Sequence, residues 1–250
     1  MITSFIKSVL FKMGIYARPI KSMPYGIHVW LDAQRITVAL GMDVETIFDV
    51  GANIGQTTRT ALEHFPQARV FAFEPLEETY RNLVNNVKAE KFFPHQLALS
   101  DEPGTAPFYV YESNLLASTI PNANFQGKFN TKHVETIVPV TTIDGFCAEH
   151  GIDRIDILKI DTEGADIKVL KGATGMLGKG AIGMVLFEFN DFVPREGSFG
   201  GSLVEIAQFL SGFGIRFLAT YTVYVDGKEG IFVVADCLAV RDPDRAKQLA

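Results

Sequence analysis

The sequence of 250 residues predicts an α/β fold with a mostly parallel seven-stranded sheet, helices on both faces and a terminal antiparallel hairpin. Short apolar runs alternate with segments of helical periodicity from Thr46 to Phe213. The first run leads directly into a glycine-rich loop, and the last two runs flank the turn dipeptide Asp226-Gly227. With 47% hydrophobic residues, a chain of this length can bury one such core.

The expected elements follow one another in this order. The first half consists of a strand over Thr46–Val50, a helix over Gln56–Phe65, a strand over Arg69–Phe73, a helix over Leu76–Asn86 and a third strand over Phe92–Leu99 that ends at the turn Ser100–Gly104. Further strands are expected over Phe108–Tyr111 and Thr136–Val140, on either side of a polar loop at 113–131. The second half adds a helix over Thr142–His150, a strand over Ile155–Ile160, a helix over Asp166–Lys171, a strand over Ala181–Phe189, a helix over Ser202–Phe213 and the hairpin strands Ile215–Tyr224 and Gly230–Val240.

Residues 1–45 are expected to form a helical extension in front of a single domain at 46–250. Apolar residues at helical spacing from Ile2 to Met13 predict an amphipathic helix. This helix packs on the domain or on a second subunit, or it lies on a membrane surface. Lys7 and Lys12 interrupt the apolar run, so it does not have the pattern of a signal peptide. The segment Gly26–Asp32 is expected to be extended or a loop near the site.

Composition restricts the possible partners. The formal net charge of −6 argues against a dedicated nucleic-acid-binding protein, because such proteins usually carry a basic face. The two cysteines, Cys147 and Cys237, have neither metal-binding nor disulfide-framework spacing, so a reducing cytoplasm is the expected location. No segment is long and apolar enough to predict a transmembrane helix.

A nucleoside site is predicted where the first two strands end. Gly51, Asn53 and Gly55 lie between a strand and a helix, where glycines let the backbone turn sharply and approach a ligand. Glu74 follows the second strand, where a carboxylate can accept hydrogen bonds from two ribose hydroxyls. The alternative is a glycine-rich turn that binds no ligand.

The residues around this loop favour S-adenosylmethionine over a dinucleotide. A dinucleotide fingerprint has a glycine where this chain has Asn53. Asp49 places an anion beside the loop, which suits a ligand with sulfonium and ammonium groups better than a pyrophosphate. The rival ligand is the nicotinamide dinucleotide of a reductase.

Several motifs together resemble those of the FkbM-type methyltransferases. They are Asp49–Gln56, Phe73–Pro75, Ala98–Asp101, Asp156–Asp166 and Val169–Gly172. The resemblance runs from about Thr46 to Asn190, and it implies a Rossmann-like class I methyltransferase fold that uses S-adenosylmethionine. It implies most often O-methylation of a hydroxyl on a sugar, glycan or polyketide.

The resemblance also implies roles for individual residues. Gly51, Asn53 and Gly55 would line the methionine part of the donor, Asp49 would face its ammonium group, Glu74 would hold the ribose, and Ser100 and Asp101 would contact the adenine. For Ser100 and Asp101, an ordinary turn before Pro103-Gly104 is the alternative.

The carboxyl end of the strand Ile155–Ile160 is expected to carry the chemistry, because ligands bind at this edge of open α/β sheets. Asp161 is the first candidate for the base that removes a hydroxyl proton, and Glu163 is the second. Lys159 lies on the same side of the strand as Asp161 and is expected to pair with it. Alternatively, Asp161 caps the following helix, and Lys159 and Glu163 form a structural ion pair.

Three further residues are candidates for contact with the acceptor. Glu188 and Asn190 lie at the end of a later strand, and with Asp161 they also form an oxygen-rich set of the kind that holds Mg²⁺, which is the less economical interpretation. Trp30 is either a platform for a sugar face or a core residue. The remaining alternatives are an N-methyltransferase acting on a small-molecule amine, a nicotinamide-dependent reductase and a non-catalytic binding protein.

Overall fold

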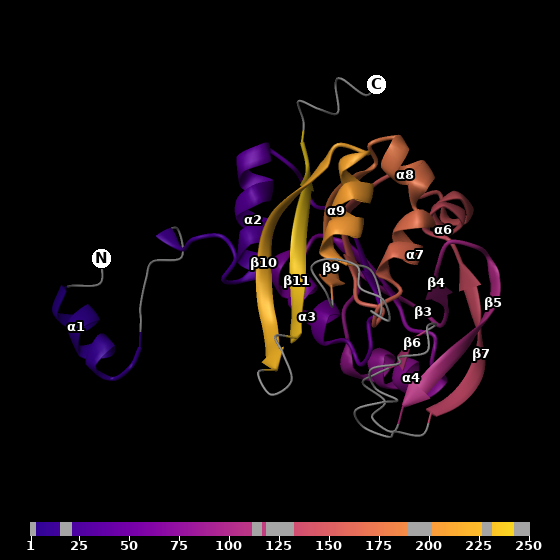
Figure 1. Cartoon of the computed structure of the whole chain (residues 1–250), viewed down its shortest axis with the longest axis horizontal. Coiled ribbons are helices and arrows are strands. Elements are labelled where there is room, and N and C mark those ends of the chain that lie inside the picture. The colour runs from indigo at the N-terminus through magenta and orange to yellow at the C-terminus, as the bar shows by residue number, and fades with distance from the viewer. Residues whose placement is uncertain are drawn as a thin grey trace.

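The computed structural model describes residues 4–15, 22–111, 117–118, 133–189, 202–226 and 232–242. Its centre is a seven-stranded sheet in the order β10-β11-β9-β8-β1-β2-β3 (Figure 1). These strands are β1 Thr46–Val50, β2 Arg69–Phe73, β3 Phe92–His95, β8 Ile155–Ile160, β9 Ile182–Phe189, β10 Ile215–Asp226 and β11 Phe232–Arg241. Within this sheet β11 pairs antiparallel with both of its neighbours, and the other pairs are parallel. The mostly parallel sheet and its terminal hairpin are confirmed.

Helices cover both faces of this sheet, as the alternating pattern predicts (Figure 1). One face is covered by α6 Ile143–His150, α7 Asp166–Lys171, α8 Thr174–Gly178 and α9 Leu203–Ser211, and the other by α2 Val29–Leu40 and α3 Gln56–His64. A further helix, α4 Glu77–Asn86, packs through Leu83 and Val87 against Ala52 and Ala72. Every residue of β1 and β8 is buried, which explains why both strands are nearly continuous apolar runs.

The segment Gly26–Asp32 was expected to be extended or a loop. Its first three residues form a turn, whereas the rest is helical because α2 begins at Val29. His28 is the N-cap residue, and its ring accepts a hydrogen bond from the Leu31 backbone N–H at 3.3 Å. β-Branched and aromatic residues at the start of a helix resemble a strand, and here packing on the sheet overrides that local preference. The buried residues of α2 are Trp30, Asp32, Ala33, Ile36 and Thr37.

The predicted strand Phe92–Leu99 is two strands in two different sheets. β3 ends at His95 and belongs to the large sheet, whereas β4 Ala98–Leu99 belongs to a second sheet. That sheet has the order β4-β7-β5-β6, where β5 is Gly104–Tyr111, β6 is Ala117–Ser118 and β7 is His133–Thr141. Its apolar residues Ala98, Phe108, Val138 and Val140 pack together and extend the wall of the site described below.

The first helix, α1 Ser4–Lys12, lies apart from both sheets (Figure 1). Its side chains Ile6, Val9 and Phe11 are exposed, so the packing expected against the domain is not found for these residues. No helix in the described part of the chain is long and apolar enough to cross a bilayer.

Candidate active site

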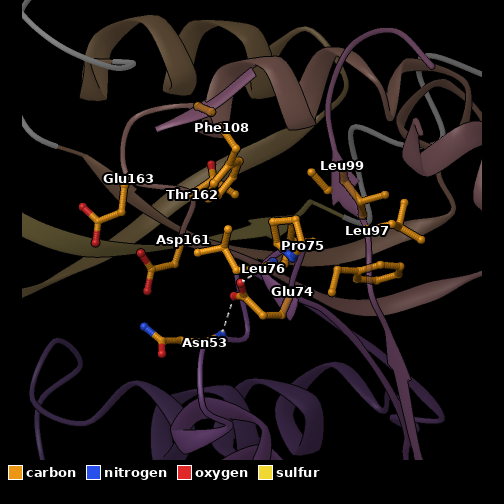
Figure 2. A pocket seen from close by; sticks show the side chains of 15 residues that line it. Asn53, Glu74, Pro75, Leu76, Leu97, Leu99, Phe108, Asp161, Thr162 and Glu163 are labelled. Atoms are coloured by element: carbon orange, nitrogen blue, oxygen red, sulfur yellow. Dashed lines mark hydrogen bonds between the residues drawn. The ribbon is translucent and has the colours of Figure 1, made fainter. Parts of the chain in front are cut away.

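A pocket lies at the carboxyl ends of β1, β2 and β8, which is the edge predicted to bind ligands. It encloses about 670 Å³ of space, part of which is open solvent. Figure 2 shows Asp161 and Glu163 on one side, Leu97 and Leu99 on the opposite side, and Glu74 between them. The pocket therefore has an acidic side and an apolar side.

The loop after β1 is held closely against the neighbouring strand ends. Gly51 adopts a φ of +75°, and a Cβ atom at this position would lie 1.9 Å from the backbone oxygen of Asp161. Asn53 also has a left-handed φ of 49° and lines the pocket. Its Oδ1 atom is buried and has no hydrogen-bond partner among the described residues. The loop thus presents an unsatisfied acceptor to the site, as a donor-rich ligand requires.

Glu74 occupies the position that the sequence predicts for the ribose-binding acid. Its side chain is 6% exposed, and its two oxygens accept hydrogen bonds from the backbone N–H groups of Asn53 and Leu76, both at 3.1 Å. Burial raises the pKa of Glu74 to about 7, although these two hydrogen bonds lower it. Each carboxylate oxygen retains a lone pair after the backbone bond, so the group can still accept two hydroxyl hydrogen bonds.

Lys159 lies between the buried Asp49 and Asp161 on the acidic side of the pocket. Its Nζ atom lies 3.2 Å from Asp49 Oδ1 and 3.3 Å from Asp161 Oδ2, and it donates a hydrogen bond to the Gly51 carbonyl oxygen at 3.2 Å. Burial lowers the pKa of Lys159, but the charges of Asp161 and Asp49 outweigh this and hold it above its ordinary value. The predicted pairing of Lys159 with Asp161 is therefore confirmed.

Asp49 does not reach the ligand surface. Its side chain is fully buried, with Oδ2 accepting a hydrogen bond from Thr58 Oγ1 at 2.5 Å and Oδ1 facing Lys159. The expected direct contact of Asp49 with a ligand ammonium group is therefore contradicted by this arrangement. Instead, Asp49 stabilises the charge on Lys159, which in turn positions Asp161.

Asp161 is accessible from the pocket, with 39% of its side chain exposed. The alternative role of Asp161 as a helix cap is not found, because the N-cap residue of α7 is Ala165 and no side chain caps this helix. Asp161 is thus held at one oxygen by Lys159 and is open to an incoming hydroxyl group. This geometry matches the requirement for a positioned base.

Glu163 lies beside Asp161 in a strained backbone conformation, with a φ of 52°. Burial, followed by the charges of Asp161 and Asp166, raises its pKa to about 8. Most Glu163 side chains therefore carry a proton at neutral pH, and they can donate a hydrogen bond there rather than accept a proton.

Further acids surround this edge of the sheet. Burial and the neighbouring acids, Asp161 first among them, raise the pKa of Glu188 to about 10 and that of Asp236 to about 6. Asp236 was not predicted as a site residue. It lies on the antiparallel strand β11 and pairs in register with Glu188 on β9. Its signal was a charged residue within an otherwise apolar strand. Among the described residues, the acids at this edge outnumber the one cation, Lys159, which makes the edge suited to a ligand that carries positive charge.

Two of the predicted ligand contacts have structural roles instead. Gly55 is buried, and a Cβ atom there would lie 2.6 Å from Val87 Cγ2, so this glycine lets α3 and α4 approach each other. Trp30 is 6% exposed and packs beside His64 and Phe65 in the core under α2, so it cannot serve as a platform for a sugar.

Ser100 and Asp101 form a turn beside the pocket rather than part of its lining. Ser100 Oγ donates a hydrogen bond to Asp101 Oδ1 at 2.9 Å, and Asp101 is exposed. The lining residues on this side are Leu97, Ala98, Leu99 and Phe108. Ser100 and Asp101 therefore do not line the pocket, and their expected contact with the adenine stays a prediction.

The metal alternative gains no support. Asn190 lies outside the described residues, so its expected contact with the acceptor or a cation stays a prediction. Among the residues that the structure describes, no three His, Cys, Asp or Glu side chains are arranged to hold a metal ion.

The strand order, the single reversed strand and the acid at the end of β2 define the Rossmann-like class I methyltransferase fold. The model of the family described as the methyltransferase FkbM domain matches residues 49–217, which is more than half of the sequence. The chain therefore belongs to the FkbM methyltransferase domain family.

Three curated relatives illustrate the range of this family. Methyltransferase sdnD of Sordaria araneosa is 31% identical over 50% of this chain and 59% of its own length. Hexuronic acid methyltransferase AglP of Haloferax volcanii is 29% identical over 58% and 57%. The 31-O-demethyl-FK506 methyltransferase FkbM of Streptomyces tacrolimicus is 28% identical over 74% and 78%. The chain thus spans somewhat more than half the length of two of these proteins and about three quarters of the third.

Proposed function

We propose that the protein transfers a methyl group from S-adenosylmethionine to a hydroxyl group of a sugar, a glycan or a sugar-containing metabolite. The observation that carries this proposal is the position of Glu74. It is a buried carboxylate at the end of β2, between an apolar wall and the accessible carboxylate of Asp161. This arrangement fits a nucleoside on one side and a reacting hydroxyl on the other.

The residues of the pocket fit S-adenosylmethionine in three respects. Glu74 has two lone pairs left for the ribose hydroxyls, and Asn53 Oδ1 is a buried acceptor that needs a donor such as an ammonium group. Leu97, Leu99 and Phe108 supply apolar surface for a purine ring. When bound, the sulfonium group supplies an electrophilic methyl group.

The role of the protein in the transfer is positioning and removal of a proton. An alcohol that attacks the methyl carbon must lose its proton as the new bond forms, and Asp161 is the carboxylate held open for it. Lys159 fixes Asp161 through the 3.3 Å ion pair and is itself fixed by Asp49. Alignment of the two reactants can supply most of the rate acceleration, and a positioned base adds a factor of roughly 10² to 10⁴.

The choice of a hydroxyl on a sugar is supported by two relatives. One is named for a hexuronic acid and the other for the 31-O position of FK506. An amine acceptor is the second candidate, and it differs in needing no base, because an amine attacks as its free base. The carboxylate at Asp161 favours the hydroxyl acceptor.

Two experiments test this function. Isothermal titration with S-adenosylmethionine, S-adenosylhomocysteine and NADH should give binding of the first two and none of the third. A mass-spectrometric screen of a glycan library should then identify products that gain one methyl group. Binding of NADH alone would refute the donor, and methylation restricted to amines would refute the acceptor.

A further inference from the structure

The first 31 residues differ from the rest of the chain in charge. They contain Lys7, Lys12, Arg18 and Lys21 and no Asp or Glu, since Asp32 is the first acidic residue. The remaining residues include 19 Lys and Arg and 29 Asp and Glu, which is a net charge of −10. A basic segment thus precedes a strongly acidic domain, and the two parts respond oppositely to an anionic surface.

The helix α1 within this segment exposes its apolar residues. Ile6, Val9 and Phe11 are 47%, 41% and 71% exposed, and Met13 and Ile15 beyond the helix are 68% and 47% exposed. Figure 1 shows α1 set apart from the sheets and helices of the domain. The apolar face is therefore not accounted for by packing within the described part of the chain.

The lysines are placed where an interfacial helix carries them. At 3.6 residues per turn, Ile6, Val9 and Met13 share one face, and Lys7 and Lys12 fall on its opposite borders. Lysines in these positions keep their charges at the headgroups while the apolar face enters the acyl boundary. A contact between the α1 helices of two copies would instead leave these charges without partners, because α1 has no acidic residue.

The segment is tethered to the domain just before α2. The buried carboxylate of Asp32 accepts hydrogen bonds from the Gly26 backbone N–H and the Tyr221 hydroxyl, both at 2.8 Å, and pairs with Arg35 at 3.0 Å. Tyr25 and Ile27, which flank Gly26, are 43% and 58% exposed. Met23 and Tyr25 also contact Arg35, so they belong to the anchor, whereas α1 lies before it. α1 can therefore bind a surface without disturbing the fold.

We propose that α1 docks the protein on an anionic lipid membrane, with its apolar face inserted at the interface and its lysines at the headgroups. The short helix gives weak and reversible binding, because stable anchoring normally requires more than one signal. The acidic domain is repelled by the same surface, so the segment alone carries the attraction. This surface is separate from the candidate active site, and its role does not depend on the proposed methyl transfer.

The test is sedimentation of the full chain with lipid vesicles. Vesicles of equal parts phosphatidylcholine and phosphatidylserine should bind the protein, and vesicles of phosphatidylcholine alone should bind it much more weakly. Because each basic residue near such a surface contributes roughly a fivefold factor, the double variant Lys7→Gln/Lys12→Gln should bind roughly 30-fold more weakly. The matched control Lys88→Gln/Lys179→Gln removes two exposed lysines of the domain and should bind like the wild type.

Three results would overturn the proposal. They are absence of binding to the anionic vesicles, equal losses in the test and control variants, and equal binding to both kinds of vesicle. The rival partner of α1 is a second copy of the chain, and light scattering detects it through the molar mass of the protein without lipid. A stable dimer without lipid that Ile6→Ser/Val9→Ser converts to a monomer would identify α1 as a subunit contact instead. Affinity for S-adenosylhomocysteine should be unchanged in every variant, so failure here and failure of the donor site are separable.

Discussion

Replacement of Glu74 by glutamine isolates the predicted ribose contact, since it removes the charge and keeps the shape of the side chain. In the wild type, two backbone N–H groups occupy one lone pair of each oxygen, which leaves two acceptors for the ribose hydroxyls. Hydrogen bonds to a charged group contribute about 1.5 to 3 kcal/mol. We therefore expect Glu74→Gln to weaken S-adenosylhomocysteine binding about 10- to 150-fold in calorimetry.

The pH dependence of binding adds a second signature. Burial raises the pKa of Glu74 to about 7, and hydroxyl donors favour its ionised form. The affinity of the wild type should therefore increase as the pH rises through about 7, whereas the affinity of Glu74→Gln should change less over this range.

The control for this experiment is Glu77→Gln, three residues further along. Glu77 is exposed and pairs with Arg81 on the surface of α4, so this variant should bind like the wild type. Thermal unfolding must show that Glu74→Gln is folded, because one backbone N–H loses its acceptor. Unchanged affinity in the folded variant would remove Glu74 from the site and refute the reasoning.

Three further predictions follow from the contacts at the strand ends. Gly51→Ala should lower the free energy of unfolding by at least about 1 to 3 kcal/mol, because it combines a left-handed φ with a clash against Asp161. The control Gly178→Ala, which has open space around it, should have little effect, and denaturant titrations measure both variants. Asp161→Asn should preserve S-adenosylhomocysteine affinity and lower kcat roughly 10²-fold or more without any EDTA effect on the wild type; full activity would show that positioning suffices, and EDTA sensitivity would favour a metal. In the folded protein the pKa of Glu188 is raised to about 10, whereas its ordinary value is 4.5. Between these two pH values the folded protein keeps a proton that the unfolded chain releases, so the free energy of unfolding falls as the pH rises. Glu188→Gln should therefore be more stable than the wild type at pH 8 by at least about 1.4 kcal/mol, the value of one pKa unit, and an unchanged midpoint would contradict this.

The sequence predicted the large sheet well because its strands have simple patterns. β1 and β8 are buried on both faces and are therefore nearly continuous apolar runs. Each is followed by residues that line the pocket. The pairing of Lys159 with Asp161 followed from the alternation of side chains along a strand. Glu74 was found because its place depends only on where β2 ends.

The errors arose where long-range packing decides the role of a residue. Gly55 looked like a ligand-binding glycine, but a glycine is needed there because Val87, at the end of α4, leaves no room for a Cβ atom. Asp49 looked accessible, and only the pairing of β1 with β8 reveals that it is buried against Lys159. Trp30 became a core residue through α2, whose start at a histidine N-cap has no strong sequence signal.

The second sheet was the largest element missed. Its strands come from segments separated by the polar loop, and β4 has only two residues, too few to show a pattern. Phe108 on β5 reaches the pocket only because β5 pairs with β7 and β7 with β4. Such lateral order is a tertiary property that local periodicity does not encode.

The central claim is that the pocket at the ends of β1, β2 and β8 binds S-adenosylmethionine through Glu74. A crystal structure with S-adenosylhomocysteine tests it most directly. The account predicts ribose hydroxyls within hydrogen-bonding distance of the Glu74 carboxylate, with the purine against Leu97, Leu99 and Phe108 and the sulfur atom facing Asp161. A ligand bound elsewhere on the protein, or one in this pocket with its ribose away from Glu74, would contradict the account.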